Sequence, residues 1–162
     1  MNLPPWYVIH TRPRCEKKVR QFCEQNFIAV VLPCYHSTHK YRGKVVTFQK
    51  PLFPGYVFVQ MLAETRSLIL QSKHVANLLD VYDQELFRKQ LDEILRALET
   101  RLEIRLAPTI GEGTHVKIKS GPLRGIEGWV EERYGLSVVL LRLDFIGQAA
   151  AVKIDAENLE LV

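Results

Sequence analysis

The chain has 162 residues, 47% hydrophobic and 25% charged, which is the composition of an ordinary globular protein. This length allows one medium domain or two small ones, and no apolar run approaches the roughly 18 residues that would cross a bilayer. The N-terminus lacks a basic segment followed by a long apolar one, so we expect no signal peptide. Three cysteines without a CxxC pair indicate reduced thiols in a cytoplasmic protein.

Charge is distributed unevenly, although the net charge of +4 is modest. Residues 1–50 contain nine lysines and arginines against two glutamates, a net charge of +7. Residues 101–162 contain eight basic against nine acidic residues, a net charge of −1. Basic charge gathered in one half predicts a surface for nucleic acid or another polyanion, and the alternative is a solvated face without a partner.

The first fifty residues predict two strands, a helix and a hairpin. Aromatic and β-branched residues over 6–10 predict a strand, and a helix is expected over 14–25, where apolar residues recur at helical spacing. Thr11 is a candidate cap for that helix. A second strand is expected over 28–32. The residue types at Arg42-Gly43 indicate a turn that closes a protruding basic hairpin.

The next segment is a proline-rich entry into a strand that is apolar on both faces. Residues 50–54 contain two prolines, which disfavour helix, and the chain turns at Gly55 into a strand over 55–61. Alternation along this strand separates two pairs of side chains, Tyr56 with Phe58 and Val57 with Val59. The protein's own helices can cover one face, and the other face needs either further core or a partner.

The remaining chain predicts a helix over 64–72, a strand over 75–82 and a long amphipathic helix over 84–100. Prolines and glycines then break regular structure, which places a linker over 101–112 between domains. Five short strands with intervening turns follow and predict a small barrel. They are expected at residues 115–119, 126–132, 137–144, 148–153 and 159–162.

The sequence contains no recognisable set of catalytic residues. The sequence has no P-loop, GxSxG or HExxH motif, so we expect no catalytic residues and no cofactor. Cys34, His36 and His39 are close in sequence, but alternate positions on a hairpin splay them, and no fourth ligand is apparent. We therefore expect no metal site.

Together, two parts of the chain resemble the NusG family of transcription elongation factors. The first part opens with Trp-Tyr-Val and includes Glu-Lys-Lys-Val at 16–19 and the segment Pro-Leu-Phe-Pro-Gly-Tyr-Val-Phe-Val at 51–59. The second part resembles the family's KOW domain, with Gly-Thr-His-Val-Lys-Ile from 113 and Ser-Gly-Pro-Leu-Arg-Gly-Ile-Glu-Gly-Trp-Val over 120–130. The resemblance covers nearly the whole chain in the family's domain order.

This resemblance implies an α+β N-terminal domain, an antiparallel sheet flanked by helices, over residues 1–100. A linker over 101–112 and an all-β, SH3-like KOW barrel over 113–162 follow. The valines and isoleucines of the second half favour strands, so we expect a constitutive barrel rather than one that refolds from helices. We expect a monomer without membrane attachment.

The resemblance also implies a set of partner contacts. The N-terminal domain would bind the clamp helices of the largest RNA polymerase subunit through an aromatic pocket of Trp6, Tyr7, Phe53, Tyr56 and Phe58. Thr65, Arg66 and Ser67 match the position that touches the opposite polymerase lobe. The residues expected to contact the non-template strand and upstream DNA are His10, Arg12, Arg14, Lys17, Lys18, Arg20, Lys40, Arg42 and Lys44.

In the KOW domain, the expected partner site is Leu123 with the tip Phe145, Ile146 and Gly147, where relatives bind a small-subunit ribosomal protein or Rho. Gln148 follows this tip where the family often has arginine, which leaves the choice of partner open. The short linker and the basic N-terminal half favour a specialised, RfaH-like antiterminator over the housekeeping factor. The alternative is a ribosome-associated or RNA-binding KOW protein that does not act on polymerase.

Overall fold

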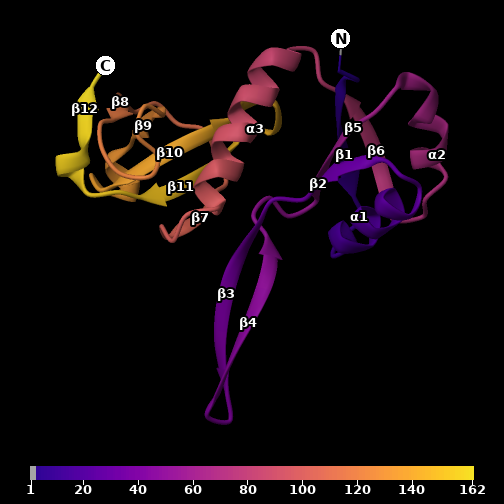
Figure 1. Ribbon diagram of the computed structural model, residues 1–162, viewed down its shortest axis with the longest axis horizontal. Helices are drawn as coiled ribbons and strands as arrows, with labels where there is room; N and C mark the ends of the chain where they lie inside the picture. The colour runs from indigo at the N-terminus through magenta and orange to yellow at the C-terminus, as the bar shows by residue number, and fades with distance from the viewer. Residues whose placement is uncertain (1–2) are drawn as a thin grey trace. The chain divides into compact units, whose positions relative to one another are not determined.

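The computed structural model describes residues 3–162, and the chain forms two compact units, Met1–Glu85 and Leu86–Val162 (Figure 1). The first unit contains a four-stranded antiparallel sheet in the order β2-β5-β1-β6 and a separate two-stranded sheet, β3-β4. Its strands are β1 (Trp6–Thr11), β2 (Ala29–Val31), β3 (Cys34–Tyr41), β4 (Lys44–Pro51), β5 (Tyr56–Gln60) and β6 (Val75–Asp80). Its helices are α1 (Glu16–Gln25) and α2 (Arg66–Leu70), the latter preceded by the 3-10 turn Ala63–Thr65.

One face of the four-stranded sheet packs against α1 and α2. Val57 and Val59 of β5 lie in a buried cluster that includes Val19 and Cys23 of α1 and Ile69 of α2. Burial raises the pKa of the Cys23 thiol to about 11, as expected for a group in a dry core. The face of β5 that the protein's own helices cover is therefore the one that carries the two valines.

Helix α1 begins later than the sequence predicts. Thr11 is the last residue of β1, and its hydroxyl donates to the carbonyl of Arg12 at 3.0 Å, so Thr11 does not cap the helix. Cys15 occupies the cap position instead and makes no side-chain capping hydrogen bond. Thr11 belongs to the strand and not to the helix cap because it pairs with Val75 of β6.

The C-terminus of α1 ends in a Schellman motif with an unusual residue. The Ile28 N–H donates to the Cys23 carbonyl at 2.9 Å, and the Phe27 N–H donates to the Glu24 carbonyl at 3.2 Å. Phe27 has φ +58°, a left-handed conformation that favours glycine, and its side chain is 98% exposed.

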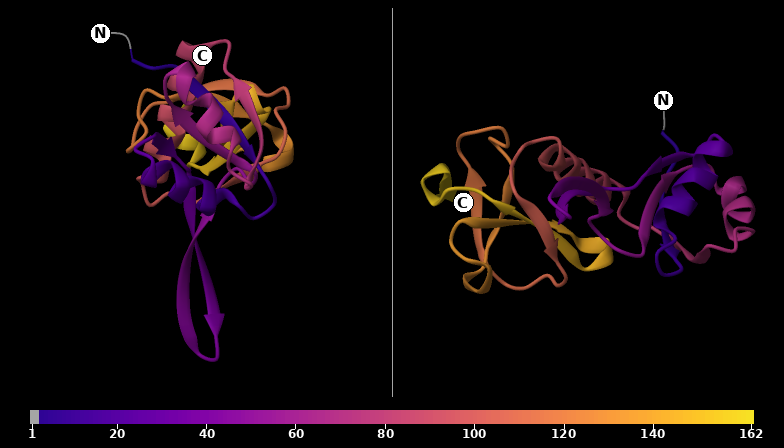
Figure 2. Two further views of the ribbon diagram at one scale, coloured as in Figure 1. Left: turned by 90° about the vertical axis from the view of Figure 1, so that its right-hand side faces the viewer. Right: turned by 90° about the horizontal axis from the view of Figure 1, so that it is seen from below.

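The second unit contains most of α3 (Gln84–Leu98) and a six-stranded antiparallel sheet that curls on itself (Figure 2). The strand order is β12-β8-β9-β10-β11-β7, so the barrel-like, all-β character expected of this half is confirmed. The strands are β7 (Ile104–Ala107), β8 (Thr114–Ile118), β9 (Glu127–Val130), β10 (Val138–Leu143), β11 (Gln148–Lys153) and β12 (Leu159–Leu161). Short 3-10 turns lie at Glu132–Tyr134, Asp144–Ile146 and Ala156–Asn158.

The division between the units differs from the boundary expected at residues 101–112. The second unit begins at Leu86, and the expected linker contains β7, which pairs with Ala149–Val152 of β11. Four alternating residues are too few to predict a strand from sequence, and β7 exists because β11 offers an edge to it. No helix in residues 3–162 is long and apolar enough to span a membrane.

Gly128 lies where two strands of the second unit approach each other closely. A Cβ built on Gly128 would meet Val139 Cγ1 at 2.5 Å and the Leu140 carbonyl oxygen at 2.8 Å. Both neighbours are buried, so neither can move without disturbing the core. Packing between the strands therefore requires glycine at position 128.

Replacing Phe27 with glycine is expected to stabilise the protein by about 1 kcal/mol, because the left-handed strain disappears and little contact area is lost. Urea unfolding measures this difference. Phe27→Ala is the control, since it removes the same ring but keeps the Cβ. A Phe27→Gly variant no more stable than Phe27→Ala would contradict the assignment of strain.

Gly128→Ala is expected to destabilise the second unit by about 1–3 kcal/mol, because the new methyl group overpacks the strand contact. The measurement is urea unfolding followed by Trp129 fluorescence in a Trp6→Phe background. Lys117→Ala, an exposed change on β8, is the control and should leave the midpoint close to that of the parent. Equal midpoints for the two variants would show that β9 and β10 can move apart at position 128 without a loss of folding free energy.

Candidate functional site

The entry into β5 is a tight turn held by a buried carboxylate. The Tyr56 N–H donates to the Phe53 carbonyl at 3.2 Å, Pro54 is the second residue of the turn, and Gly55 has φ +89°. These features define a type II turn. The Gly55 N–H donates to Glu16 Oε2 at 2.9 Å, and Glu16 is 7% exposed. The first residue of α1 therefore fixes the turn that begins β5.

Most of the expected polymerase-binding residues come together on the sheet face opposite the helix-covered cluster. The register pairs Trp6 with Gln60, Val8 with Phe58 and His10 with Tyr56, and side chains paired in this way share a face. Tyr56 stacks on His10 at a ring distance of 5.3 Å, and Phe53 meets Phe58 edge-on at 6.5 Å. We call this group the aromatic face: Trp6, His10, Phe53, Tyr56 and Phe58.

Exposure varies across the aromatic face. Phe53 and Phe58 are buried, Trp6 and Tyr56 are half-buried, and His10 is exposed. Accessible ring surface on this face therefore comes from His10, Tyr56 and Trp6, and the two phenylalanines contribute almost none.

Tyr7 does not lie on the aromatic face. It is a member of the buried cluster with Val57 and Val59, and the guanidinium of Arg66 lies over its ring at 5.4 Å. Arg66 also forms an ion pair with Asp80, and this hydrogen bond raises the pKa of the guanidinium. Of the three residues expected to face the opposite polymerase lobe, Ser67 is exposed, whereas Thr65 and Arg66 are half-buried.

The basic residues before and within α1 occupy different environments. Lys17 and Lys18 are exposed, and Arg20 lies 3.8 Å from Glu24 one turn later. Arg12 is tied down by its Nε, which donates to the Lys73 carbonyl at 3.0 Å. Arg14 is exposed with φ +61°, a strained conformation for a residue other than glycine, and such strain often accompanies function.

The hairpin β3-β4 extends from the first unit as a two-stranded ribbon (Figure 1). Arg42 and Gly43 have φ +46° and +79°, the pattern of a type I′ turn, so the expected turn is confirmed. Lys40, Arg42 and Lys44 are all exposed near its tip. Cys34, at its base, has a thiol whose pKa is raised by burial and lowered in part by Arg20 and Lys17, so the basic side of α1 adjoins the hairpin.

The register of the hairpin separates the three candidate metal ligands. Cys34 and His36 lie on one face, and His39 lies on the other. Among the residues that the structure describes, no group of three or more His, Cys, Asp and Glu side chains could hold a metal ion.

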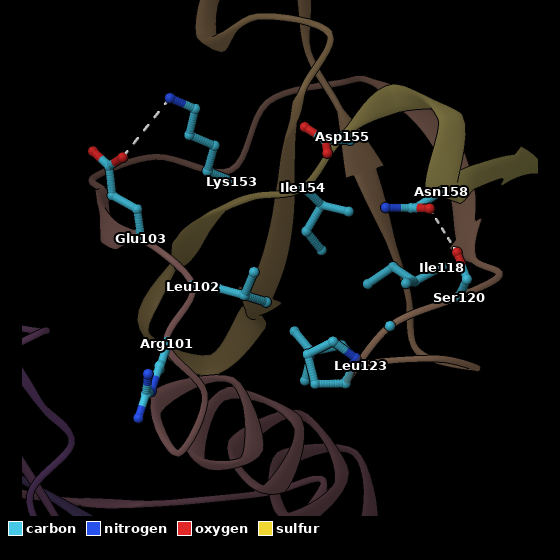
Figure 3. A pocket seen from close by; sticks show the side chains of 12 residues that line it. Arg101, Leu102, Glu103, Ile118, Ser120, Leu123, Lys153, Ile154, Asp155 and Asn158 are labelled. Atoms are coloured by element: carbon cyan, nitrogen blue, oxygen red, sulfur yellow. Dashed lines mark hydrogen bonds and ion pairs between the residues drawn. The ribbon is translucent and has the colours of Figure 1, made fainter.

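In the second unit, Leu123 lines a pocket of about 310 Å³ that contains neither Phe145 nor Ile146 (Figure 3). Leu123 is buried, and Ile118 and Ile154 contribute to the apolar part of the lining. The rim is polar: the Ser120 hydroxyl donates to Asn158 Oδ1 at 2.6 Å, and Lys153 lies 3.9 Å from Glu103. Leu123 therefore lines this pocket, whereas Phe145 and Ile146 lie outside it.

The tip between β10 and β11 packs against α3. The Phe145 ring meets Phe87 edge-on at 6.2 Å, and the Asp144 N–H donates to Gln90 Oε1 at 2.9 Å. Ile146 is half-buried, and Gly147 has φ +65° at the turn. A partner of this tip would meet Phe145 and Ile146 beside the helix.

Comparison with known proteins assigns the chain to transcription termination and antitermination factors. Residues 4–95, more than half of the chain, match the family model described as "Transcription termination factor nusG". The "Transcription termination/antitermination protein NusG" of Staphylococcus aureus is 25% identical, with 96% of this chain and 94% of that protein covered. The protein of the same name from Rickettsia typhi is 26% identical over 145 residues, 81% of this chain and 76% of that protein.

A solved structure, "Domain interaction in Thermotoga maritima NusG", shares the fold with a TM-score of 0.53 at 21% identity, covering 98% of this chain and 97% of that one. The chain belongs to the NusG family, whose members are transcription factors and not enzymes. The expected resemblance is therefore confirmed at the level of the family.

Glu16→Ala is expected to destabilise the first unit by about 1.5–3 kcal/mol, because a charged hydrogen bond is lost and the Gly55 N–H remains without its acceptor. Urea unfolding measures the loss. Glu24→Ala, an exposed glutamate on the same helix, is the matched control and should change stability by less than about 0.5 kcal/mol. If both variants unfold at the same urea concentration, the carboxylate does not hold the turn.

Proposed function

We propose that this chain is an antitermination factor that binds the clamp helices of the largest RNA polymerase subunit through the aromatic face. The observation that carries this proposal is that the two faces of β5 have different surroundings. Val57 and Val59 pack on the protein's own helices, whereas Tyr56 and Phe58 lie on the face that α1 and α2 do not cover. A helix of a partner fits such an apolar surface as a helix-in-groove contact.

The energetics favour a contact centred on Tyr56. Aromatic anchors in interfaces carry a large share of the binding energy, about 2 kcal/mol or more each. Stacking on His10 and the type II turn hold the Tyr56 ring in place before binding. Little conformational freedom is then lost on association, which improves affinity.

The basic residues of the first unit support a second contact, with the non-template strand and upstream DNA. Arg14 before α1 and Lys17 and Lys18 within it are exposed, and Lys40, Arg42 and Lys44 are exposed near the hairpin tip. Contacts of this kind are mainly to phosphate and weaken steeply with salt. The opposite polymerase lobe would meet Thr65, Arg66 and Ser67, where Ser67 offers the most accessible side chain.

For the second unit we propose recruitment of a small-subunit ribosomal protein or Rho through Phe145, Ile146 and Gly147, with Leu123 acting from its separate pocket. Large apolar side chains at a turn are typical of an interaction site. The charge of +7 in residues 1–50 exceeds what an apolar clamp contact requires and supports a specialised, RfaH-like antiterminator. Such a factor would work in the cytoplasm as a monomer.

Tyr56→Ala is expected to weaken binding to RNA polymerase roughly 30-fold, because an anchor of about 2 kcal/mol is lost. Affinity is measured with the full chain and purified core polymerase, and folding is checked by urea unfolding. Phe27→Ala is the matched control, since it removes an exposed aromatic ring at the end of α1 and should bind like the parent. Phe58→Ala is less informative because Phe58 is buried and its loss also weakens the fold.

Wild-type affinity in a folded Tyr56→Ala variant would exclude the aromatic face as the binding surface. Co-purification tests the function as a whole. Recovery of RNA polymerase with the tagged chain supports the proposal. Recovery of ribosomal particles without polymerase would instead support a ribosome-associated or RNA-binding protein.

A further inference from the structure

The hairpin carries a cluster of aromatic rings that the proposed phosphate contacts do not use. Register places two sets of four side chains on one side of the ribbon, and we call this side the ring face. The ring face consists of Tyr35, Ser37, His39 and Tyr41 from β3 and Lys44, Val46, Phe48 and Lys50 from β4. On the opposite side, Thr38, Val45 and Thr47 are exposed without ring or charge, and the exposed His36 and Lys40 are the imidazole and the ammonium of that side.

Three rings of this face are in mutual contact. His39 lies 5.7 Å from Phe48 and 6.2 Å from Tyr41, and Tyr41 meets Phe48 edge-on at 6.5 Å. Tyr41 is 57% exposed and Phe48 is 41% exposed. Tyr41 lies in the last strand pair before the turn and Phe48 lies near the middle of the ribbon, and rings with this much accessible surface can stack on a planar ligand.

His39 is held in one orientation by its neighbours. Its Nε2 lies 3.0 Å from Lys50 Nζ and 3.0 Å from Ser37 Oγ. Two polar contacts to one ring nitrogen restrict rotation of the imidazole. The cluster is therefore preorganised, and the Lys50 side chain lies beside the rings.

The charge of the hairpin selects the ligand. Residues 34–51 contain Lys40, Arg42, Lys44 and Lys50 and no aspartate or glutamate. Positive charge without compensation, interleaved with aromatic rings, is complementary to a polyanion that carries flat, unpaired rings of its own.

We propose that the ring face of the hairpin binds single-stranded DNA by stacking unpaired bases on Tyr41 and Phe48, while Lys44 and Lys50 pair with flanking phosphates. Duplex DNA cannot stack its bases on these rings, because its bases stack on one another and offer only their edges in the grooves. The choice of DNA over RNA rests on the proposed function, which brings the chain to an opened DNA template.

The test is fluorescence anisotropy with the full chain and four labelled probes of equal length. These are a 12-nucleotide oligothymidine, the same backbone without bases, a 12-base-pair duplex and a 12-nucleotide oligouridine. We expect oligothymidine to bind at least about 10-fold more tightly than the abasic strand, because stacking supplies the difference. It should also bind more tightly than the duplex and the oligouridine.

The variant Tyr41→Ala/Phe48→Ala should lower affinity for oligothymidine by about 10-fold or more and leave affinity for the abasic strand unchanged. Its salt dependence should match that of the parent, because no charge is removed. The matched control is Val45→Ala/Thr47→Ala, which truncates two exposed side chains on the opposite side of the same strand. Circular dichroism and urea unfolding establish that both variants retain the fold.

Three results would overturn the inference: equal binding of oligothymidine and the abasic strand, wild-type affinity in the ring variant, or tighter binding of duplex or oligouridine. Loss of polymerase affinity in the ring variant with unchanged binding of oligothymidine would make the ring face a protein contact instead. Polymerase binding by the parent chain is measured separately. A failed stacking test with intact polymerase binding therefore overturns this inference alone.

Discussion

The two-sided character of β5 depends on its register with β1, and a single buried carboxylate holds the point where that register begins. Side chains alternate with a period of two, so a slip of one residue would turn Tyr56 and Phe58 toward α1 and expose Val57 and Val59. The Gly55 N–H is bound by Glu16, and the Gly55 carbonyl accepts from the Thr11 N–H at 2.8 Å. The turn is thus tied to both α1 and β1 before the strand starts, which leaves one register available.

This constraint separates a face that builds the fold from a face that can meet a partner. The helix-covered side is closed, because Val57 and Val59 are buried together with Val19 and Cys23 of α1 and Ile69 of α2. The other side combines rings with polar neighbours, because His10 pairs with both Tyr56 and Asn77 across the sheet. Polar groups beside apolar rings suit a surface that alternates between water and a partner, since they remain hydrated when the partner leaves.

Sequence alone predicts the features that are set by local chemistry. The alternation of β5, the turn at Arg42-Gly43 and the strands of the second half follow from residue type and spacing. Features that depend on distant neighbours were missed or misplaced: Tyr7 lies in the core, β7 lies in the expected linker, and Glu16 holds a turn 39 residues away. Charge on Glu16 predicts exposure, and only the three-dimensional position of Gly55 explains its burial.

The hairpin shows how stability and binding can compete in one element. A two-stranded hairpin is marginal by itself, so the contacts among His39, Tyr41 and Phe48 contribute to holding its strands together. Four basic residues without an acidic one work against that stability through mutual repulsion. Acidic partners across the strands would relieve the repulsion, and neither strand contains one. A polyanion would relieve it from outside, and a ligand that also carries stackable rings would reinforce the contacts that hold the ribbon.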